Sequence, residues 1–82
     1  MSRYVIWSKN NCIYCSKAKA ILEQKGIDYE ERNVEGPVWT SEDFMKAVPP
    51  GARTFPQIFQ GDKYIGSYDN MMTFWTLGEL KL

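Results

Sequence analysis

The chain has 82 residues, which allows one domain over residues 1–82 with a compact core, because short chains bury a smaller share of their surface. Ten basic and ten acidic residues give a formal net charge of zero, which argues against a protein that coats nucleic acid or an anionic membrane. No stretch approaches the roughly 20 apolar residues that span a bilayer, and the first residues lack a signal-peptide pattern, so we expect a cytoplasmic protein.

The first half of the chain predicts a strand, a helix and a second strand. β-branched and aromatic residues at 4–7 indicate a buried strand. Apolar residues at helical spacing predict a helix over about 13–25, and Gly26 is a typical left-handed cap after it. The alternating segment 29–34 predicts another strand. A helix between two strands suggests a right-handed β-α-β crossover.

The second half predicts a helix, a hairpin and a last helix. Side-chain oxygens and early acidic residues at 40–43 favour a short helix that runs to about Val48. Strands over 57–60 and 63–65 are close enough to form an antiparallel hairpin, and Asp69 or Asn70 can cap the final helix. The apolar residues of that helix are Met71, Met72, Phe74, Trp75 and Leu77. The candidate core residues of the chain are Tyr4, Val5, Ile6, Trp7, Ile21, Leu22, Phe44, Ile58, Phe59, Phe74 and Trp75.

The only two cysteines, Cys12 and Cys15, stand where the first strand gives way to the first helix. A disulfide is attacked by the thiolate, and the free amides and dipole of a helix N-terminus favour a negative sulfur at Cys12. A dipole alone rarely lowers a thiol pKa far enough, so amide hydrogen bonds and the nearby Lys9 are expected to contribute. Cys15 lies about one turn further on, where a buried thiol can attack a mixed disulfide at Cys12. The spacing therefore predicts an exposed nucleophile and a resolving thiol.

Two other interpretations of the cysteine pair remain open from spacing alone. The pair could be inert, since so short a disulfide ring constrains little of the unfolded chain. It could also be half of a zinc site, but structural zinc usually takes four Cys or His ligands, and the chain has no histidine and no third cysteine. We therefore predict no metal.

A second element, Arg53-Thr54-Phe55-Pro56-Gln57, precedes the predicted hairpin. In cis geometry Pro56 would turn the preceding backbone outward as an exposed edge, to which an extended thiol substrate could add as a strand. An ordinary trans-proline bend is the more frequent alternative.

Together these residues resemble the glutaredoxin family, within the thioredoxin-like fold. The resemblance rests on the order and spacing of a Lys three residues before the first Cys, Cys-x-Tyr-Cys, Thr-x-Pro-Gln-Ile-Phe, and Ile-Gly-x-Tyr-Asp, and it covers nearly the whole chain. It implies an α/β fold with a four-stranded mixed sheet flanked by three helices, in the order β-α-β-α-β-β-α. It also implies a cis bond before Pro56.

The resemblance further implies a glutathione-dependent thiol–disulfide oxidoreductase that acts through Cys12 and Cys15. Such a protein would be a monomer with no tightly bound cofactor, would use glutathione as co-substrate, and would reduce glutathione mixed disulfides and protein disulfides, with ribonucleotide reductase one candidate client. The backbone of Phe55 would pair with the cysteinyl part of glutathione, and Asp69 would meet its ammonium group. The implied glutathione-binding residues are Lys9, Tyr14, Arg53, Thr54, Phe55, Pro56, Ser67, Tyr68 and Asp69.

Each of these assignments has a simpler competitor. Lys9 and Arg53, which the resemblance places at the glycyl carboxylate, could be solvated surface charges. Asp69 could be only a helix cap, and Tyr14 only a surface aromatic residue.

The chain departs from the common glutaredoxin pattern at two positions. Ile13 stands where many members have proline, which restores an amide donor beside the Cys12 sulfur and predicts a changed acidity or reduction potential. Ser67 stands where the family often has a second glycine, and it would be strained if that position needs a positive φ.

Two other functions remain as alternatives. One is a thioredoxin-like protein that a flavoprotein reductase reduces directly, although the chain lacks the Trp-Cys-Gly-Pro-Cys pattern. The other is an iron–sulfur carrier, in which Cys12 thiolates from two chains and two glutathione molecules would hold one cluster.

Overall fold

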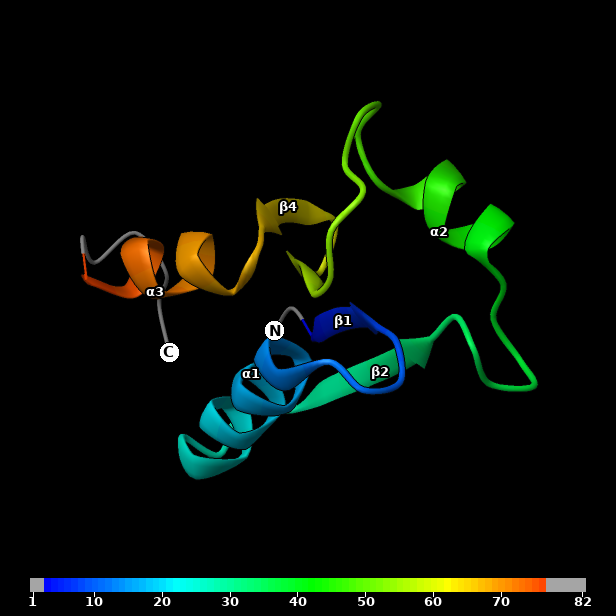
Figure 1. Cartoon of the computed structure of the whole chain (residues 1–82). Coiled ribbons are helices and arrows are strands. Elements are labelled where there is room, and N and C mark those ends of the chain that lie inside the picture. Colours follow the sequence, from blue (N-terminus) through cyan, green and yellow to red (C-terminus); the bar gives the residue numbers. More distant parts are fainter. Residues whose placement is uncertain (1–2, 77–82) are drawn as a thin grey trace.

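The computed structural model describes residues 3–76, so Leu77, which we expected in the last helix, lies outside the described part of the chain. The elements follow the expected order β-α-β-α-β-β-α (Figure 1). Their bounds are β1 Tyr4–Ser8, α1 Ile13–Gln24, β2 Tyr29–Asn33, α2 Ser41–Ala47, β3 Gln57–Gln60, β4 Lys63–Gly66 and α3 Tyr68–Thr76.

The four strands form one mixed sheet in the order β2-β1-β3-β4. β1 pairs with β2 in parallel, with Tyr4 opposite Tyr29, and α1 is the crossover between them. The β1–β3 and β3–β4 pairs are antiparallel, and Ile6 faces Ile58. The predicted crossover and hairpin are therefore both present, with β1 near the centre of the sheet.

The end of α1 and the start of α2 are set by residues that the sequence singled out. α1 ends at Gln24 with Lys25 as its C-cap, and Gly26 follows with φ of +69°, a left-handed conformation that glycine adopts without steric cost. α2 begins with a capping box, in which the Thr40 hydroxyl accepts from the Asp43 amide and the Asp43 carboxylate accepts from the Thr40 amide.

Alternate residues of β1 pack into two separate hydrophobic clusters, because successive side chains of a strand point to opposite faces. One cluster lies between the sheet, α1 and α3, and consists of Tyr4, Ile6, Ala18, Leu22, Ile58, Ile65 and Met71. The other joins the sheet to α2 through Trp7, Phe44 and Val48, and in Figure 1 α2 stands away from α1 and α3. Of the expected core residues, Val5, Ile21, Phe59, Phe74 and Trp75 are only half-buried.

No helix among residues 3–76 combines the length and the apolar character needed to cross a membrane.

Candidate active site

Cys12 occupies the N-cap position of α1. Its backbone is extended, with φ −119° and ψ 106°, and the Cys15 amide donates a hydrogen bond of 3.2 Å to the Cys12 Sγ. A serine or aspartate oxygen usually accepts this bond at a helix start, and here sulfur takes its place. A thiolate at Cys12 would accept the same hydrogen bond from the Cys15 amide and would be stabilised by the positive end of the helix dipole.

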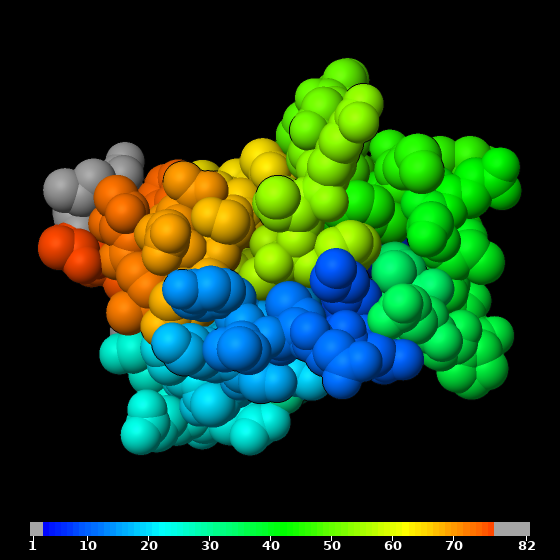
Figure 2. All heavy atoms as spheres, viewed as in Figure 1, coloured from blue at the N-terminus to red at the C-terminus, as the bar shows by residue number. Residues whose placement is uncertain are grey.

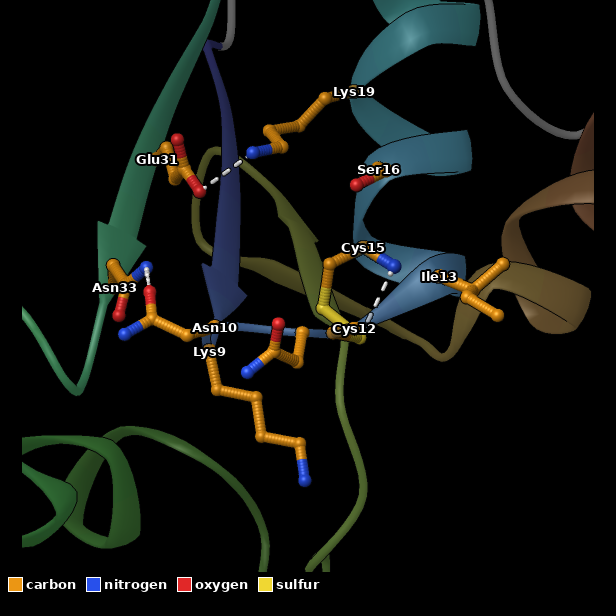
Figure 3. Close-up of a pocket in the computed structure, with 10 residues that line it drawn as sticks. Lys9, Asn10, Cys12, Ile13, Cys15, Ser16, Lys19, Glu31 and Asn33 are labelled. Carbon is orange, nitrogen blue, oxygen red and sulfur yellow. Dashed lines mark hydrogen bonds and ion pairs between the residues drawn. A yellow bond between two sulfur atoms is a disulfide. The ribbon is translucent and has the colours of Figure 1, made fainter.

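The two sulfurs differ in exposure, as the sequence predicted. Cys12 is half-buried, whereas Cys15 is buried, with 2% of its surface exposed. The two residues are joined in a disulfide with their Cα atoms 5.2 Å apart (Figure 3). A disulfide substrate therefore reaches Cys12 first, and Cys15 is placed to attack Cys12 from within the protein.

The turn before Cys12 is fixed by polar residues that sequence reasoning did not assign to the site. Asn11 adopts φ of +54°, in the left-handed region where Asn is enriched among non-glycine residues. The Asn10 backbone N–H donates to Glu35 Oε1 at 2.7 Å, and the Asn33 side chain donates to Asn10 Oδ1 at 3.1 Å. The end of β2 and the residues that follow it thus hold the turn that presents Cys12. The only sequence signal was the Asn10-Asn11 pair itself.

The segment before β3 lies against the cysteine turn. The Phe55–Pro56 bond is cis, as the resemblance implied, and the Phe55 carbonyl oxygen lies 3.8 Å from the Cys12 Sγ. The buried Gln57 side chain donates to the Thr54 carbonyl at 3.0 Å and to its hydroxyl at 3.1 Å, which orders the segment. The Phe55 amide has no hydrogen-bond partner within residues 3–76. This backbone edge is therefore free to pair with a substrate.

The start of α3 differs from the prediction. The cap is Ser67, whose hydroxyl accepts a hydrogen bond from the Asn70 backbone N–H at 3.4 Å. The Asn70 side-chain Oδ1 in turn accepts from the Ser67 backbone N–H at 3.0 Å. Asp69 and Asn70 are therefore not the cap residues, although Asn70 completes the reciprocal pair. The positive φ falls on Gly66, at +119°, so the strain considered for Ser67 is absent. A Cβ on Gly66 would lie 2.5 Å from Asn70 Oδ1, which explains glycine at this position.

Most of the expected glutathione-binding residues come together beside Cys12. They line one hollow of about 150 Å³, in which the ring centroids of Tyr14 and Tyr68 lie 5.6 Å apart. The lining residues are Tyr14, Thr54, Phe55, Pro56, Ser67, Tyr68 and Asp69.

The two expected cations do not line this hollow. The Lys9 Nζ lies 5.8 Å from the centroid of the Phe55 ring, and Arg53 lines a groove on the α2 side of Phe55. Both residues are exposed, and neither forms an ion pair within residues 3–76. Lys9 and Arg53 therefore flank the Phe55 edge without entering the small hollow.

A larger polar hollow of about 560 Å³ lies between α1 and β2 on the other side of the cysteines (Figure 3). Lys19 Nζ pairs with Glu31 Oε2 at 2.8 Å, and the buried Ser8 hydroxyl donates to the same oxygen at 2.7 Å. Burial acts to raise the pKa of Glu31, but the hydrogen bonds from Lys19 and Ser8 outweigh it and hold the pKa below its usual value of 4.5. This ion pair ties α1 to β2 close to the cysteine turn.

The glutaredoxin family model matches residues 4–65, which include the cysteine turn, the Phe55–Pro56 edge and the hairpin up to Ile65. The chain belongs to the glutaredoxin family. It is 34% identical over 80 residues to Glutaredoxin 3 of Escherichia coli strain K12, covering 98% of this chain and 94% of the relative. It is 35% identical over 81 residues to a glutaredoxin of Pseudomonas aeruginosa, with 98% and 93% covered.

Solved glutaredoxin structures share the fold. A buckwheat glutaredoxin–glutathione complex aligns with a TM-score of 0.80 at 29% identity, covering 96% of this chain and 73% of that one. Wheat glutaredoxin aligns with a TM-score of 0.81 at 26% identity, covering 96% and 78%. These comparisons confirm the thioredoxin-like fold and the interpretation of the Cys12/Cys15 pair as the redox centre of a glutaredoxin.

Proposed function

We propose that this glutaredoxin is a glutathione-dependent thiol–disulfide oxidoreductase that reduces glutathione mixed disulfides and protein disulfides. One observation carries the proposal: seven of the nine residues expected to bind glutathione line a single hollow beside Cys12. The buckwheat relative in complex with glutathione, which shares the fold over 96% of this chain, supports the same co-substrate.

The groups around the hollow complement glutathione in polarity. The free amide and the carbonyl of Phe55 suit the cysteinyl backbone, which would pair as an added strand. First-turn amides of a helix have no intrahelical partner, so those of Tyr68 and Asp69 suit the α-carboxylate of the γ-glutamyl end. The Asp69 carboxylate, which has no ion pair within residues 3–76, suits the ammonium group. Lys9 and Arg53 remain the candidates for the glycyl carboxylate.

The chemistry needs only the two sulfurs and glutathione. The Cys12 thiolate attacks the glutathione sulfur of a mixed disulfide, a Cys12–glutathione disulfide forms, and the client thiolate leaves. A second glutathione thiolate then attacks the glutathione sulfur, which releases oxidised glutathione and restores the Cys12 thiolate. With a protein disulfide, Cys12 attacks one client sulfur and the other client sulfur leaves as a thiolate. Cys15 then attacks Cys12, releases the first client sulfur as a thiolate and closes the observed Cys12–Cys15 disulfide. Two glutathione molecules reduce this disulfide again in two exchange steps and leave as oxidised glutathione.

We further propose that the protein works as a monomer without a resident cofactor, and that its clients are proteins with accessible disulfides. Ribonucleotide reductase, which needs a dithiol donor, is one candidate, and no residue of this chain identifies it.

Turnover of a glutathione mixed disulfide, coupled to glutathione reductase, tests the proposal with wild type, Cys12→Ser and Cys15→Ser. We expect Cys12→Ser to abolish turnover because the nucleophile is lost. Cys15→Ser is expected to retain it, because a second glutathione replaces the resolving thiol.

A wild type that is inactive in this assay but accepts electrons from thioredoxin reductase would contradict the proposal in favour of the thioredoxin-like alternative. A brown, dimeric protein after anaerobic reconstitution with iron and sulfide would instead favour a cluster carrier.

A further inference from the structure

An apolar groove lies between α2 and the segment 49–55, and only Arg53 and Phe55 among its lining residues are also proposed to bind glutathione. Its volume is about 570 Å³, and the segment that forms its second wall projects beyond the sheet next to α2 (Figures 1 and 2). The groove, called the α2 groove below, is lined by Ser41, Phe44, Met45, Val48, Pro49, Pro50, Gly51, Ala52, Arg53 and Phe55.

The α2 groove is continuous with the exchange site through Phe55. The Phe55 ring stacks on Phe44 with centroids 4.5 Å apart and planes inclined by 28°. Phe55 lines both the α2 groove and the small hollow, and its carbonyl oxygen lies 3.8 Å from the Cys12 Sγ. One side chain thus separates the two cavities, and both open beside the same backbone edge.

The large apolar side chains at the surface point to a polypeptide as the occupant. Ile13 and Met45 are 72% and 68% exposed, the first beside Cys12 and the second in the α2 groove. Methionine is flexible and polarizable, which suits a surface that receives apolar side chains of varied shape. Among the residues that line the α2 groove, only Arg53 and Phe55 are also proposed to bind glutathione, so most of the groove is left to a longer substrate.

Strand geometry gives the reach of such a substrate. An extended chain that pairs with Phe55 advances about 3.3 Å per residue, so a side chain two positions from its cysteine lies roughly 7 Å away on the same face. Phe55 adjoins both features, because its carbonyl oxygen lies 3.8 Å from the Cys12 Sγ and the residue lines the α2 groove. The groove is also large enough for one bulky apolar side chain.

We propose that the α2 groove binds an apolar side chain near the reactive cysteine of an extended client polypeptide, and so selects among protein disulfides. The inference rests on the proposed function in taking protein disulfides as substrates. The groove adds affinity for the client through residues such as Phe44, Met45 and Val48, which do not line the glutathione hollow.

The test measures formation of the mixed disulfide in a Cys15→Ser background, where Cys12 is the only thiol. Reduced protein is mixed with a symmetric peptide disulfide, Cys12 attacks one peptide sulfur, and the other peptide leaves as its thiolate. Mass spectrometry follows the adduct for peptides that carry either leucine or serine two residues to each side of the cysteine. We expect the leucine peptide to react roughly tenfold faster, because burial of one such side chain is worth about that factor.

Substitution at the groove should remove the selection. We expect the leucine and serine peptides to react at similar rates with Met45→Glu, and the leucine peptide to remain faster with Met45→Leu. Val38→Glu is the matched control, because Val38 is 74% exposed, lies outside the groove and undergoes the same change of charge.

Equal rates for the two peptides with Met45 intact would overturn the inference, and so would equal effects of Met45→Glu and Val38→Glu. The reaction with glutathione disulfide, which should be unchanged by Met45→Glu, is measured in parallel. If that reaction fails while the peptide preference persists, the proposed glutathione dependence is wrong and the groove assignment stands.

Discussion

At the scale of single residues, the position of one sulfur at a helix start decides the chemistry. Cys12 caps α1, and the Cys15 amide already donates to its sulfur. The Ile13 and Tyr14 amides belong to the same first turn and have no partner within residues 3–76. The glutaredoxin pattern often has proline at position 13, so this chain offers the Cys12 thiolate one more potential donor than many relatives have.

We expect Ile13→Pro to raise the pKa of the reduced Cys12 thiol, because the amide at position 13 is lost. The fold should tolerate the change, since the first position of a helix is favourable for proline and Ile13 is exposed. Ultraviolet absorbance of the thiolate, followed against pH in a Cys15→Ser background, measures the effect.

Ile13→Ala is the control for Ile13→Pro, because it removes the same exposed apolar side chain and keeps the amide. Similar titration curves for both variants would show that the amide at position 13 does not act on the sulfur.

At the scale of elements, local sequence patterns were sufficient for the order and type of every helix and strand. Periodicity and capping chemistry are local, so the Thr40 capping box and the left-handed Gly26 followed from neighbouring residues. The cap of α3 was assigned wrongly because Ser67, Asp69 and Asn70 are all competent caps, and only the backbone at Gly66 determines which is used. Residue types alone therefore do not show which of several neighbouring N-cap candidates begins a helix.

Only those parts of the candidate site that contain a sequence motif could be predicted from the sequence. The cysteine turn and the Phe55–Pro56 edge were recognised from their spacing, and the structure brings them within 3.8 Å. The contacts from Asn10 to Glu35 and Asn33 join residues more than 20 positions apart, so no window of sequence contains them. The α2 groove was missed for a different reason: its lining residues all lie within 41–55, but the space between α2 and the segment after it depends on how the two pack.

The contact between α1 and β2 also depends on pH. Burial acts to raise the pKa of Glu31, but the hydrogen bonds from Lys19 and Ser8 hold it below its usual 4.5. Ionised Glu31 therefore contributes stability at pH values above its unfolded pKa. That contribution is lost as the pH falls from about 4.5 through the lowered folded value. We expect Glu31→Gln to be less stable than wild type at neutral pH, by under about 1 kcal/mol because the pair is partly exposed.

Urea unfolding of wild type and Glu31→Gln from neutral pH to below pH 4.5 tests this expectation, and the two curves should converge in acid. Glu42→Gln serves as the control, because Glu42 is exposed and has no ion pair within residues 3–76. A constant difference between wild type and Glu31→Gln at all pH values would show that ionisation of Glu31 plays no part.

At the scale of the whole molecule, the two hydrophobic clusters have different consequences for the site. The cluster against α1 and α3 contains Ile6, which is fully buried, and does not include Phe55. The cluster against α2 contains Trp7 and Phe44, whose ring centroids lie 5.9 Å apart, and Phe44 in turn stacks on Phe55. The side chains packed on the α2 face of the sheet therefore contact Phe55, whose backbone edge lies beside Cys12.

We expect two conservative core substitutions to separate stability from reactivity. Ile6→Val should lower the free energy of unfolding by about 0.5–1.5 kcal/mol and leave the reaction of Cys12 with glutathione disulfide unchanged. Phe44→Leu should lower stability and also slow that reaction several-fold, because the Phe55 edge loses the stacking, worth about 0.5–1.5 kcal/mol, that holds it in place.

Urea unfolding and the rate of mixed-disulfide formation, both in a Cys15→Ser background, measure the two effects. If Ile6→Val and Phe44→Leu slow the reaction in proportion to their loss of stability, the rate reports general loosening of the fold. If only Phe44→Leu slows it, the α2 face positions the Phe55 edge. The α2 groove and the glutathione hollow would then depend on one aromatic stack, because Phe55 lines them both.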